Sequence, residues 1–129
     1  MVYTSYFSNL KNLINLENTK FVSIAGKSAD EFIELMNKDP EKFIQYKKLA
    51  PKYSWWKEWH DNGYTNMWYI NKYNETVLSL LNPNEVYSEL TNDNFDVILL
   101  CWEGKNKFCH RKLVAQWLEN NLNIKVKEL

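Results

Sequence analysis

One short run constrains the fold of this chain more than any other feature: Asp96–Trp102, DVILLCW, which is nearly continuous in apolar residues. A strand with one face in water alternates apolar and polar residues, and this run does not alternate. Strands buried on both faces are typical of parallel sheets, because the crossover helices of such sheets cover both faces. The run therefore predicts the central strand of an α/β domain.

Three further segments are predicted to be strands. Val2–Tyr6 and Lys20–Ile24 are rich in β-branched and aromatic residues, and Ile124–Lys127 alternates weakly, as expected for a last strand at an edge. The segments between them have the caps and apolar periodicity of helices. The predicted helices are Ser28–Asn37 with Ser28 as its cap, Pro40–Leu49, a short helix from Trp55 to near Gly63, Met67–Leu81, one that starts at Asn82-Pro83-Asn84-Glu85 and runs to about Leu90, and Cys109–Asn121.

Strands that alternate with helices predict an α/β fold of Rossmann-like layering, with a mainly parallel central sheet of about four strands flanked by helices. A length of 129 residues fits a single compact domain, residues 1–129.

Lys+Arg and Asp+Glu both number 16, and this zero net charge disfavours duplex DNA as a partner. No apolar run approaches the roughly 20 residues of a membrane span. With two cysteines and no signal-peptide pattern, we expect a reducing, cytoplasmic location.

A group of chemically reactive residues follows the predicted central strand. In LLCWEGKNKFCHRKL, Cys101 and Glu103 end the strand, and Cys109, His110 and Arg111 begin the next helix. In open parallel sheets, ligands bind beyond the carboxyl ends of the strands. The sequence therefore places a candidate site at this corner.

Several kinds of site fit the corner poorly. Structural zinc needs four ligands, and the adjacent Cys109 and His110 are not expected to reach the same ion, so we expect no metal and no cofactor. A stable disulfide between Cys101 and Cys109 does not suit a reducing compartment, and the Cys-x-x-Cys redox spacing is missing; a regulatory disulfide formed on oxidation stays open. The spacing to Arg111 also differs from the Cys-x5-Arg loop of phosphate-handling thiol enzymes.

A helix start is a favourable place for an anion, because its first N–H groups are free and its dipole end is positive. Arg111 and Lys105 would add charge, and a thiol at this end would have a lowered pKa. Glu103 is either a general base or the partner of Arg111. Three interpretations stay open: a structural corner with Cys101 as a small buried side chain, a ligand site without chemistry, and a catalytic site.

Two weaker patterns lie elsewhere in the chain. Ala25-Gly26-Lys27-Ser28 follows a strand, but Phe21 stands where a phosphate-binding P-loop needs glycine, so we interpret this segment as a plain turn whose amides still face the same edge. The cluster Trp55, Trp56, Trp59 and His60 has helical spacing. Such a cluster can stack on a base or sugar, and the spacing favours the core.

Three motifs together resemble the domain-of-unknown-function family 488 (DUF488), in its phage and bacterial branch. They are the Cys-x-Glu and Cys-His-Arg of Cys101–Arg111, the opening strand Tyr3–Phe7, and the segment Tyr46–Pro51. The resemblance implies a compact cytoplasmic α/β domain with a functional corner. It brings no established reaction. Family members accompany nucleic-acid modification, defence or phage functions, which implies a nucleotide as the leading ligand.

We therefore expect a small intracellular enzyme acting on a nucleotide-like or other phosphorylated small molecule. One alternative is a non-catalytic protein that sequesters or senses a nucleotide-derived ligand, associated with phage or defence, and another is a protein-interaction module. The expected partner is an anionic small molecule, and no protein partner is predicted. The predicted catalytic residues are Cys101, Glu103, Cys109 and His110, and the predicted ligand-binding residues are Arg111, Lys105, Tyr6, Ser23, Gly26, Tyr46 and Trp102.

Overall fold

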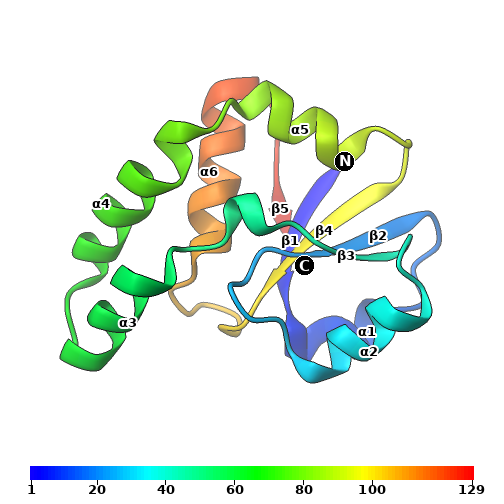
Figure 1. Ribbon diagram of the computed structural model, residues 1–129. Helices are drawn as coiled ribbons and strands as arrows, with labels where there is room; N and C mark the ends of the chain where they lie inside the picture. Colours follow the sequence, from blue (N-terminus) through cyan, green and yellow to red (C-terminus); the bar gives the residue numbers. More distant parts are fainter.

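The computed structural model describes residues 1–129 and contains one five-stranded sheet (Figure 1). Its strands are β1 Val2–Tyr6, β2 Thr19–Ser23, β3 Phe43–Gln45, β4 Asp96–Cys101 and β5 Lys127–Glu128. Their order is β3-β2-β4-β1-β5, and every pair is parallel. The predicted central strand is confirmed as β4, which pairs with β1 on one side and β2 on the other.

Helices cover both faces of this sheet, which confirms the predicted layering. They are α1 Leu10–Leu13, α2 Asp30–Lys38, α3 Tyr53–Asn62, α4 Asn66–Thr76, α5 Pro83–Thr91 and α6 His110–Leu122, with the 3₁₀ turns η1 Phe7–Asn9, η2 Lys47–Leu49 and η3 Leu78–Leu80. In Figure 1, α1 and α2 lie on one side of the sheet, and α3 to α6 lie on the other. None of the helices combines the length and the apolar character that crossing a membrane requires.

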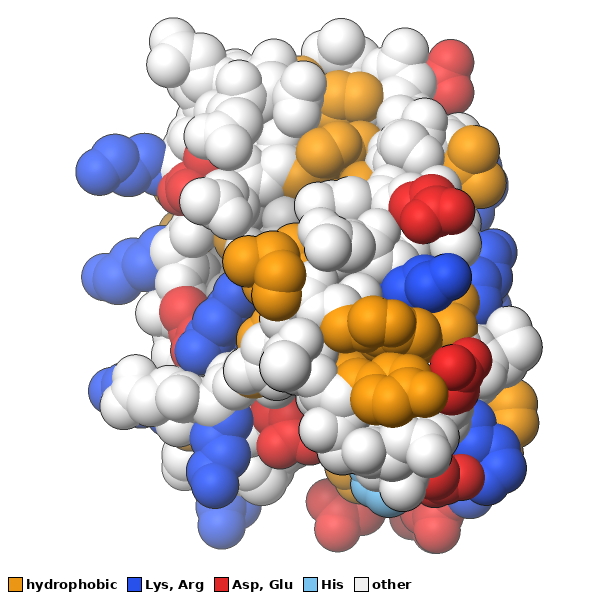
Figure 2. Space-filling model, turned by 90° about the vertical axis from the view of Figure 1, so that its left-hand side faces the viewer, with side chains coloured by type: hydrophobic (Ala, Val, Ile, Leu, Met, Phe, Trp, Pro, Cys, Tyr) orange, Lys and Arg blue, Asp and Glu red, His pale blue; other side chains and the backbone are white.

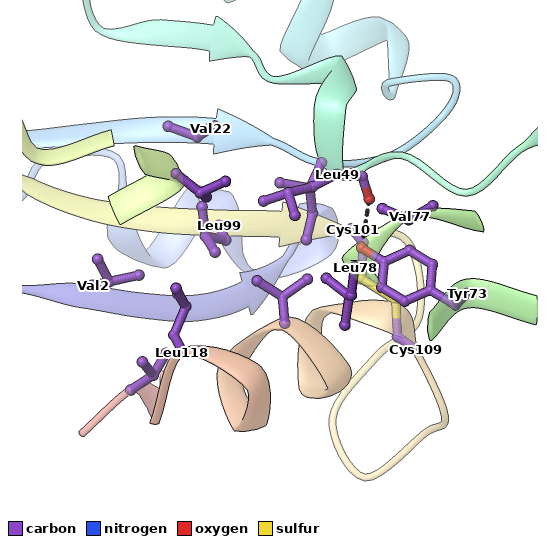
Figure 3. Packing of buried hydrophobic residues seen from close by; sticks show 14 of the residues in the cluster. Val2, Val22, Leu49, Tyr73, Val77, Leu78, Leu99, Cys101, Cys109 and Leu118 are labelled. Atoms are coloured by element: carbon purple, nitrogen blue, oxygen red, sulfur yellow. Dashed lines mark hydrogen bonds between the residues drawn. A yellow bond between two sulfur atoms is a disulfide. The ribbon is translucent and has the colours of Figure 1, made fainter. Parts of the chain in front are cut away.

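The apolar side chains of β4 belong to two hydrophobic cores, one on each face of the sheet. Val97, Leu99 and Cys101 belong to the core that β4 shares with α4, α5 and α6, whereas Ile98 and Leu100 belong to the core on the α1 and α2 side. Figure 3 shows the first of these cores, with Leu99 and Cys101 among side chains from neighbouring strands and helices. Because side chains alternate along a strand, burial on both faces leaves no polar position in the run.

Two expectations about the elements are wrong in the same region. Pro40–Leu49 is not a helix, because Phe43–Gln45 pairs with β2 as an edge strand and a 3₁₀ turn follows it. The sheet therefore has five strands instead of about four. Ser28 does not cap α2, whose cap position is Ala29. The Ser28 hydroxyl is buried instead and hydrogen-bonds Ser23.

Helix ends with a clear chemical signal lie where the sequence predicts them. Gly63 ends α3 with φ +63°, a left-handed conformation that glycine adopts without a Cβ penalty. Asn82 caps α5, since its Oδ1 accepts hydrogen bonds from the backbone N–H groups of Asn84 at 2.9 Å and Glu85 at 3.3 Å. The helix expected over Met67–Leu81 is shorter, because α4 ends at Thr76 and gives way to η3.

Candidate functional site at the carboxyl end of the sheet

The two cysteines meet where β4 ends and α6 begins. Cys101 is the last residue of β4, Cys109 directly precedes α6, and a disulfide joins their sulfur atoms. Both side chains are buried, and Figure 3 shows the bond beside Tyr73. The sequence analysis disfavoured a stable disulfide between these cysteines and left one formed on oxidation open; the structure contains the bond. The strand end and the helix start bring together sulfurs that are eight positions apart in the chain.

His110 lies against Cys109 with a fixed orientation. Its Nε2 donates a hydrogen bond to the carbonyl of Ile24 at 2.7 Å, which leaves Nδ1 facing the Cys109 sulfur at 3.7 Å. Burial lowers the pKa of His110 to about 4, although the Ile24 carbonyl favours the protonated form, and the nearby charge of Arg111 lowers it further. The imidazole is therefore neutral near pH 7, with an unprotonated Nδ1 beside the sulfur.

The same three residues have the donor atoms of a metal site. The ligand atoms of Cys101, Cys109 and His110 lie within 4.8 Å of one another. The expectation that Cys109 and His110 do not reach the same ion stays a prediction. Two thiolates and an imidazole suit zinc or a similar thiophilic ion. The bonded sulfurs are not thiolates, however, and an ion would need the reduced pair.

Arg111 is completely buried, and each of its nitrogens is occupied. Nε and Nη2 donate to the carboxylate of Glu128, with the Nε to Oε1 distance at 2.8 Å. Nη2 also donates to the carbonyl of Gly104 at 3.0 Å, and Nη1 donates to the carbonyl of Glu103. Nη1 further approaches the sulfur of Cys101 at 3.2 Å. The carboxylate partner of Arg111 is therefore Glu128, and Glu103 contributes its backbone oxygen only.

This arrangement makes Arg111 part of the framework around the cysteines. Partial burial raises the pKa of Glu128, but the Arg111 guanidinium outweighs it and holds the pKa below its usual value. The ring of Tyr6 lies 5.4 Å from the guanidinium carbon, a cation–π distance. The charge of Arg111 is thus balanced inside the protein. The positive charge that the sequence analysis expects Arg111 to add at the helix start is therefore engaged by Glu128.

A cavity of about 770 Å³ opens at this corner. Six aromatic side chains line it: Tyr53, Trp56, Trp59, Tyr69, Trp102 and Phe108. Cys109, His110 and Glu103 also line it, and so do Ala25, Gly26 and Lys27 from the turn after β2. Cys101 does not belong to the lining and is 1% exposed. Of the two cysteines, only Cys109 lines the cavity.

The aromatic wall is held in place by ring contacts and by hydrogen bonds from its tryptophans. Phe108 contacts Tyr69 edge-on with centroids 4.9 Å apart, and Trp59 lies 6.2 Å from Phe108. Trp102 donates from Nε1 to the carbonyl of Lys27 at 2.6 Å, which ties the loop after β4 to the turn after β2. Because these rings come from α3, α4 and the loop between β4 and α6, the wall joins elements that are distant in the sequence.

The tryptophan cluster of α3 divides between core and cavity. Trp55 is buried and donates from Nε1 to Thr76, so the core assignment is confirmed for this residue. Trp56, Trp59 and His60 line the cavity instead. On the side of the molecule formed by α3 and α4, Figure 2 shows hydrophobic side chains at the surface among acidic and basic ones. Exposed Tyr53 lies at the start of α3.

The remaining predicted ligand-binding residues take different positions. Gly26 lines the cavity, and Ser23 is buried and hydrogen-bonded to Ser28 at 2.7 Å. Tyr46 lies outside the cavity lining and donates to Glu89 at 3.1 Å. Lys105 is exposed and is not part of the lining. The structure therefore brings Gly26 to the corner and leaves Tyr46 and Lys105 away from it.

Several residues of the corner are missing from the sequence prediction. Glu128, which neutralises Arg111, gives no local signal because it lies 17 positions further along the chain. Phe108 stands inside the LLCWEGKNKFCHRKL motif, and Tyr69 and Lys27 face it across the cavity. Phe108 could have been predicted as a site residue from the sequence, because it is an aromatic residue directly before Cys109. The positions of Tyr69 and Lys27 depend on the packing of α4 and of the turn after β2.

These features place the protein in a general class, the parallel α/β proteins, with cysteine, histidine and arginine residues grouped at the carboxyl edge of its sheet. A family model for DUF488-N3a, described as the active DUF488-N3 subclade, matches residues 34–122. The chain belongs to the DUF488 family. Searches of curated proteins and of solved structures found no match. Assignment to a phage and bacterial branch stays a prediction.

Proposed function

We propose that this protein is an enzyme that binds a ring-containing, anionic small molecule of the nucleotide type in the aromatic cavity and reacts with it through Cys109. The observation that carries the proposal is the position of Cys109, a residue of the cavity lining whose sulfur lies 3.7 Å from Nδ1 of His110. A nucleophile beside an oriented acceptor is the usual arrangement of covalent catalysis.

The shape and chemistry of the cavity support a flat anionic ligand. Aromatic rings such as Trp59 and Trp102 offer faces on which a base can stack. The first turn of α6 begins at His110 and has no side-chain cap, so its N–H groups suit a phosphate or carboxylate. Lys27 adds a positive charge to the lining.

Each residue of the corner then has a distinct role in the reduced protein. Cys109 is the attacking group, and Nδ1 of neutral His110 orients its thiol by accepting a hydrogen bond from it. Arg111 is a positioning residue, because its guanidinium is fully engaged with Glu128, backbone carbonyls and the Cys101 sulfur. The anion is held by the helix start and Lys27 instead of Arg111.

A thermal-shift screen of the reduced protein against nucleotides tests this proposal. A nucleotide at a hundredfold its Kd is expected to add about 2.7 kcal/mol of stability and so raise the melting temperature. Trp102→Ala should weaken that shift, whereas the exposed Met67→Ala, outside the cavity, should leave it unchanged. Cys109→Ser should keep binding and abolish conversion of the bound nucleotide, followed by chromatography. A screen without any stabilising nucleotide, or conversion by Cys109→Ser, would contradict the proposal.

A non-catalytic binding protein is the second candidate, and the disulfide favours it. While Cys101 and Cys109 are bonded, the cavity contains no free thiol. For a protein that only binds, Cys109→Ser leaves nucleotide affinity unchanged and neither protein converts the ligand. The same screen and chromatography therefore separate the two candidates.

A further inference from the structure

We propose that Cys101 and Cys109 are a working dithiol–disulfide pair, and that the protein exchanges disulfides with small, anionic thiol compounds in the cavity. This inference rests on one part of the proposed function, the assignment of Cys109 as the reacting sulfur. It adds a second sulfur, a substrate class and a direction of electron flow. It needs no nucleotide.

The two sulfurs differ in access. Cys109 lines the cavity, whereas Cys101 is 1% exposed and lies outside the lining. A small thiol or disulfide can therefore reach Cys109 only, and Cys101 can react only with Cys109. This asymmetry assigns the mixed disulfide to Cys109 and the resolving step to Cys101.

The two sulfurs also differ in their electrostatic surroundings. Nη1 of Arg111 lies 3.2 Å from the Cys101 sulfur, and Glu128 with two backbone carbonyls fixes the guanidinium there. A cation beside a sulfur stabilises its thiolate. Cys109 faces the neutral imidazole of His110 instead. Arg111 is therefore placed to stabilise Cys101 as the leaving thiolate when the disulfide is attacked, and exchange is faster when the leaving thiolate is stabilised.

The exchange balances in both directions. In the oxidised protein a small thiolate attacks the Cys109 sulfur, the bond to Cys101 breaks, and Cys101 takes the electron pair as a thiolate beside Arg111. A second small thiolate attacks the outer sulfur of the mixed disulfide, which releases a small disulfide and leaves both cysteines reduced. In reverse, Cys109 attacks a small disulfide and releases one thiolate. Cys101 then attacks Cys109, re-forms the internal bond and releases the second thiolate, so two electrons pass from the protein to the substrate.

Glutathione and its disulfide are suitable probes, because their carboxylates match the α6 start and Lys27 at the cavity. Reduced protein is mixed with glutathione disulfide in the presence of a chelator, and the products are read by mass spectrometry. Cys101→Ser should accumulate a single glutathionyl group on Cys109, since it lacks the resolving sulfur. Cys109→Ser should gain none, and the unaltered protein should form the internal disulfide and release glutathione.

Three results would overturn the inference: a glutathionyl group on Cys101 in Cys109→Ser, equal modification of both variants, or no reaction of the folded, reduced protein. Should a serine variant fail to fold, acid quenching of the unaltered protein at short times and peptide mapping give the same answer. The transient glutathionyl group must then be found on Cys109. If nucleotides bind and are converted while glutathione disulfide never reacts, the proposed function stands and disulfide exchange is rejected.

Discussion

His110 is the residue whose environment in the protein differs most from water. Its ring is buried, it donates to Ile24, and the charge of Arg111 lies close by. Burial and the charge of Arg111 disfavour the imidazolium, outweigh the opposite effect of the Ile24 carbonyl, and lower the pKa of His110 from 6.5 to about 4. An unfolded chain has none of these interactions, so below pH 6.5 the unfolded state binds a proton that the folded state does not.

The first prediction concerns the pH dependence that follows. Because the folded pKa of His110 lies below the unfolded value, its contribution to stability is complete above pH 6.5 and is lost as the pH falls from 6.5 towards 4. Each pH unit in this window costs about 1.4 kcal/mol, so the loss approaches about 3 kcal/mol near pH 4. Urea unfolding at pH 7 and at pH 4.5 measures it.

His110→Gln is the control, because it removes the titrating ring and keeps an N–H donor for Ile24. Glu128 also titrates in acid, with a pKa held low by Arg111, but it does so in both proteins. The free energy of unfolding should therefore fall more steeply with acid in the unaltered protein than in His110→Gln. Equal slopes would mean that His110 is not buried as a neutral ring.

At the scale of single elements, the sequence predicts those strands and helix ends that have a distinctive local residue pattern. The β4 run is apolar on both faces, and Asn82 and Gly63 mark helix ends that the structure confirms. β3 has only three residues and pairs with one neighbour, so it shows no readable alternation and its residues resemble part of a helix. β3 forms because it pairs with β2, and this pairing cannot be predicted from the residues of β3 alone.

The second prediction tests one of these signals. Asn82 satisfies the N–H groups of Asn84 and Glu85 at the start of α5, and alanine cannot accept these bonds. Asn82→Ala should lower the free energy of unfolding by about 1 kcal/mol, measured by urea unfolding. Asn84→Ala is the matched control, since only its backbone takes part in the cap. A variant Asn82→Ala as stable as Asn84→Ala would show that the cap does not stabilise α5 in this fold.

At the scale of the whole molecule, the corner is assembled from segments that are distant in the chain. Cys101 ends β4, Ile24 follows β2, and Glu128 lies in β5. The sequence predicts the meeting of strand end and helix start, because parallel topology fixes it. It cannot predict the partner of Arg111 or the bond between the cysteines, because those depend on how loops and the last strand pack. For the same reason the sequence does not show that Tyr46 and Lys105 lie outside the cavity lining.

The last prediction concerns the link between β5 and the corner. Glu128 is the carboxylate that balances the fully buried Arg111, and its strand pairs with β1 at the edge of the sheet. Glu128→Ala leaves a buried guanidinium without its counter-charge, a change that is strongly destabilising in proteins. Since the Glu128 side chain is 26% exposed, water can enter in its place, and we expect the free energy of unfolding, measured in urea, to fall by about 2–3 kcal/mol.

Lys127→Ala, on the exposed neighbour in β5, should change stability little. Glu128→Gln keeps the hydrogen-bond acceptor and should lie between the two. If Glu128→Ala is as stable as Lys127→Ala, the charge of Arg111 is balanced by the backbone carbonyls of Glu103 and Gly104 alone, and the last strand is not needed to hold the guanidinium beside Cys101.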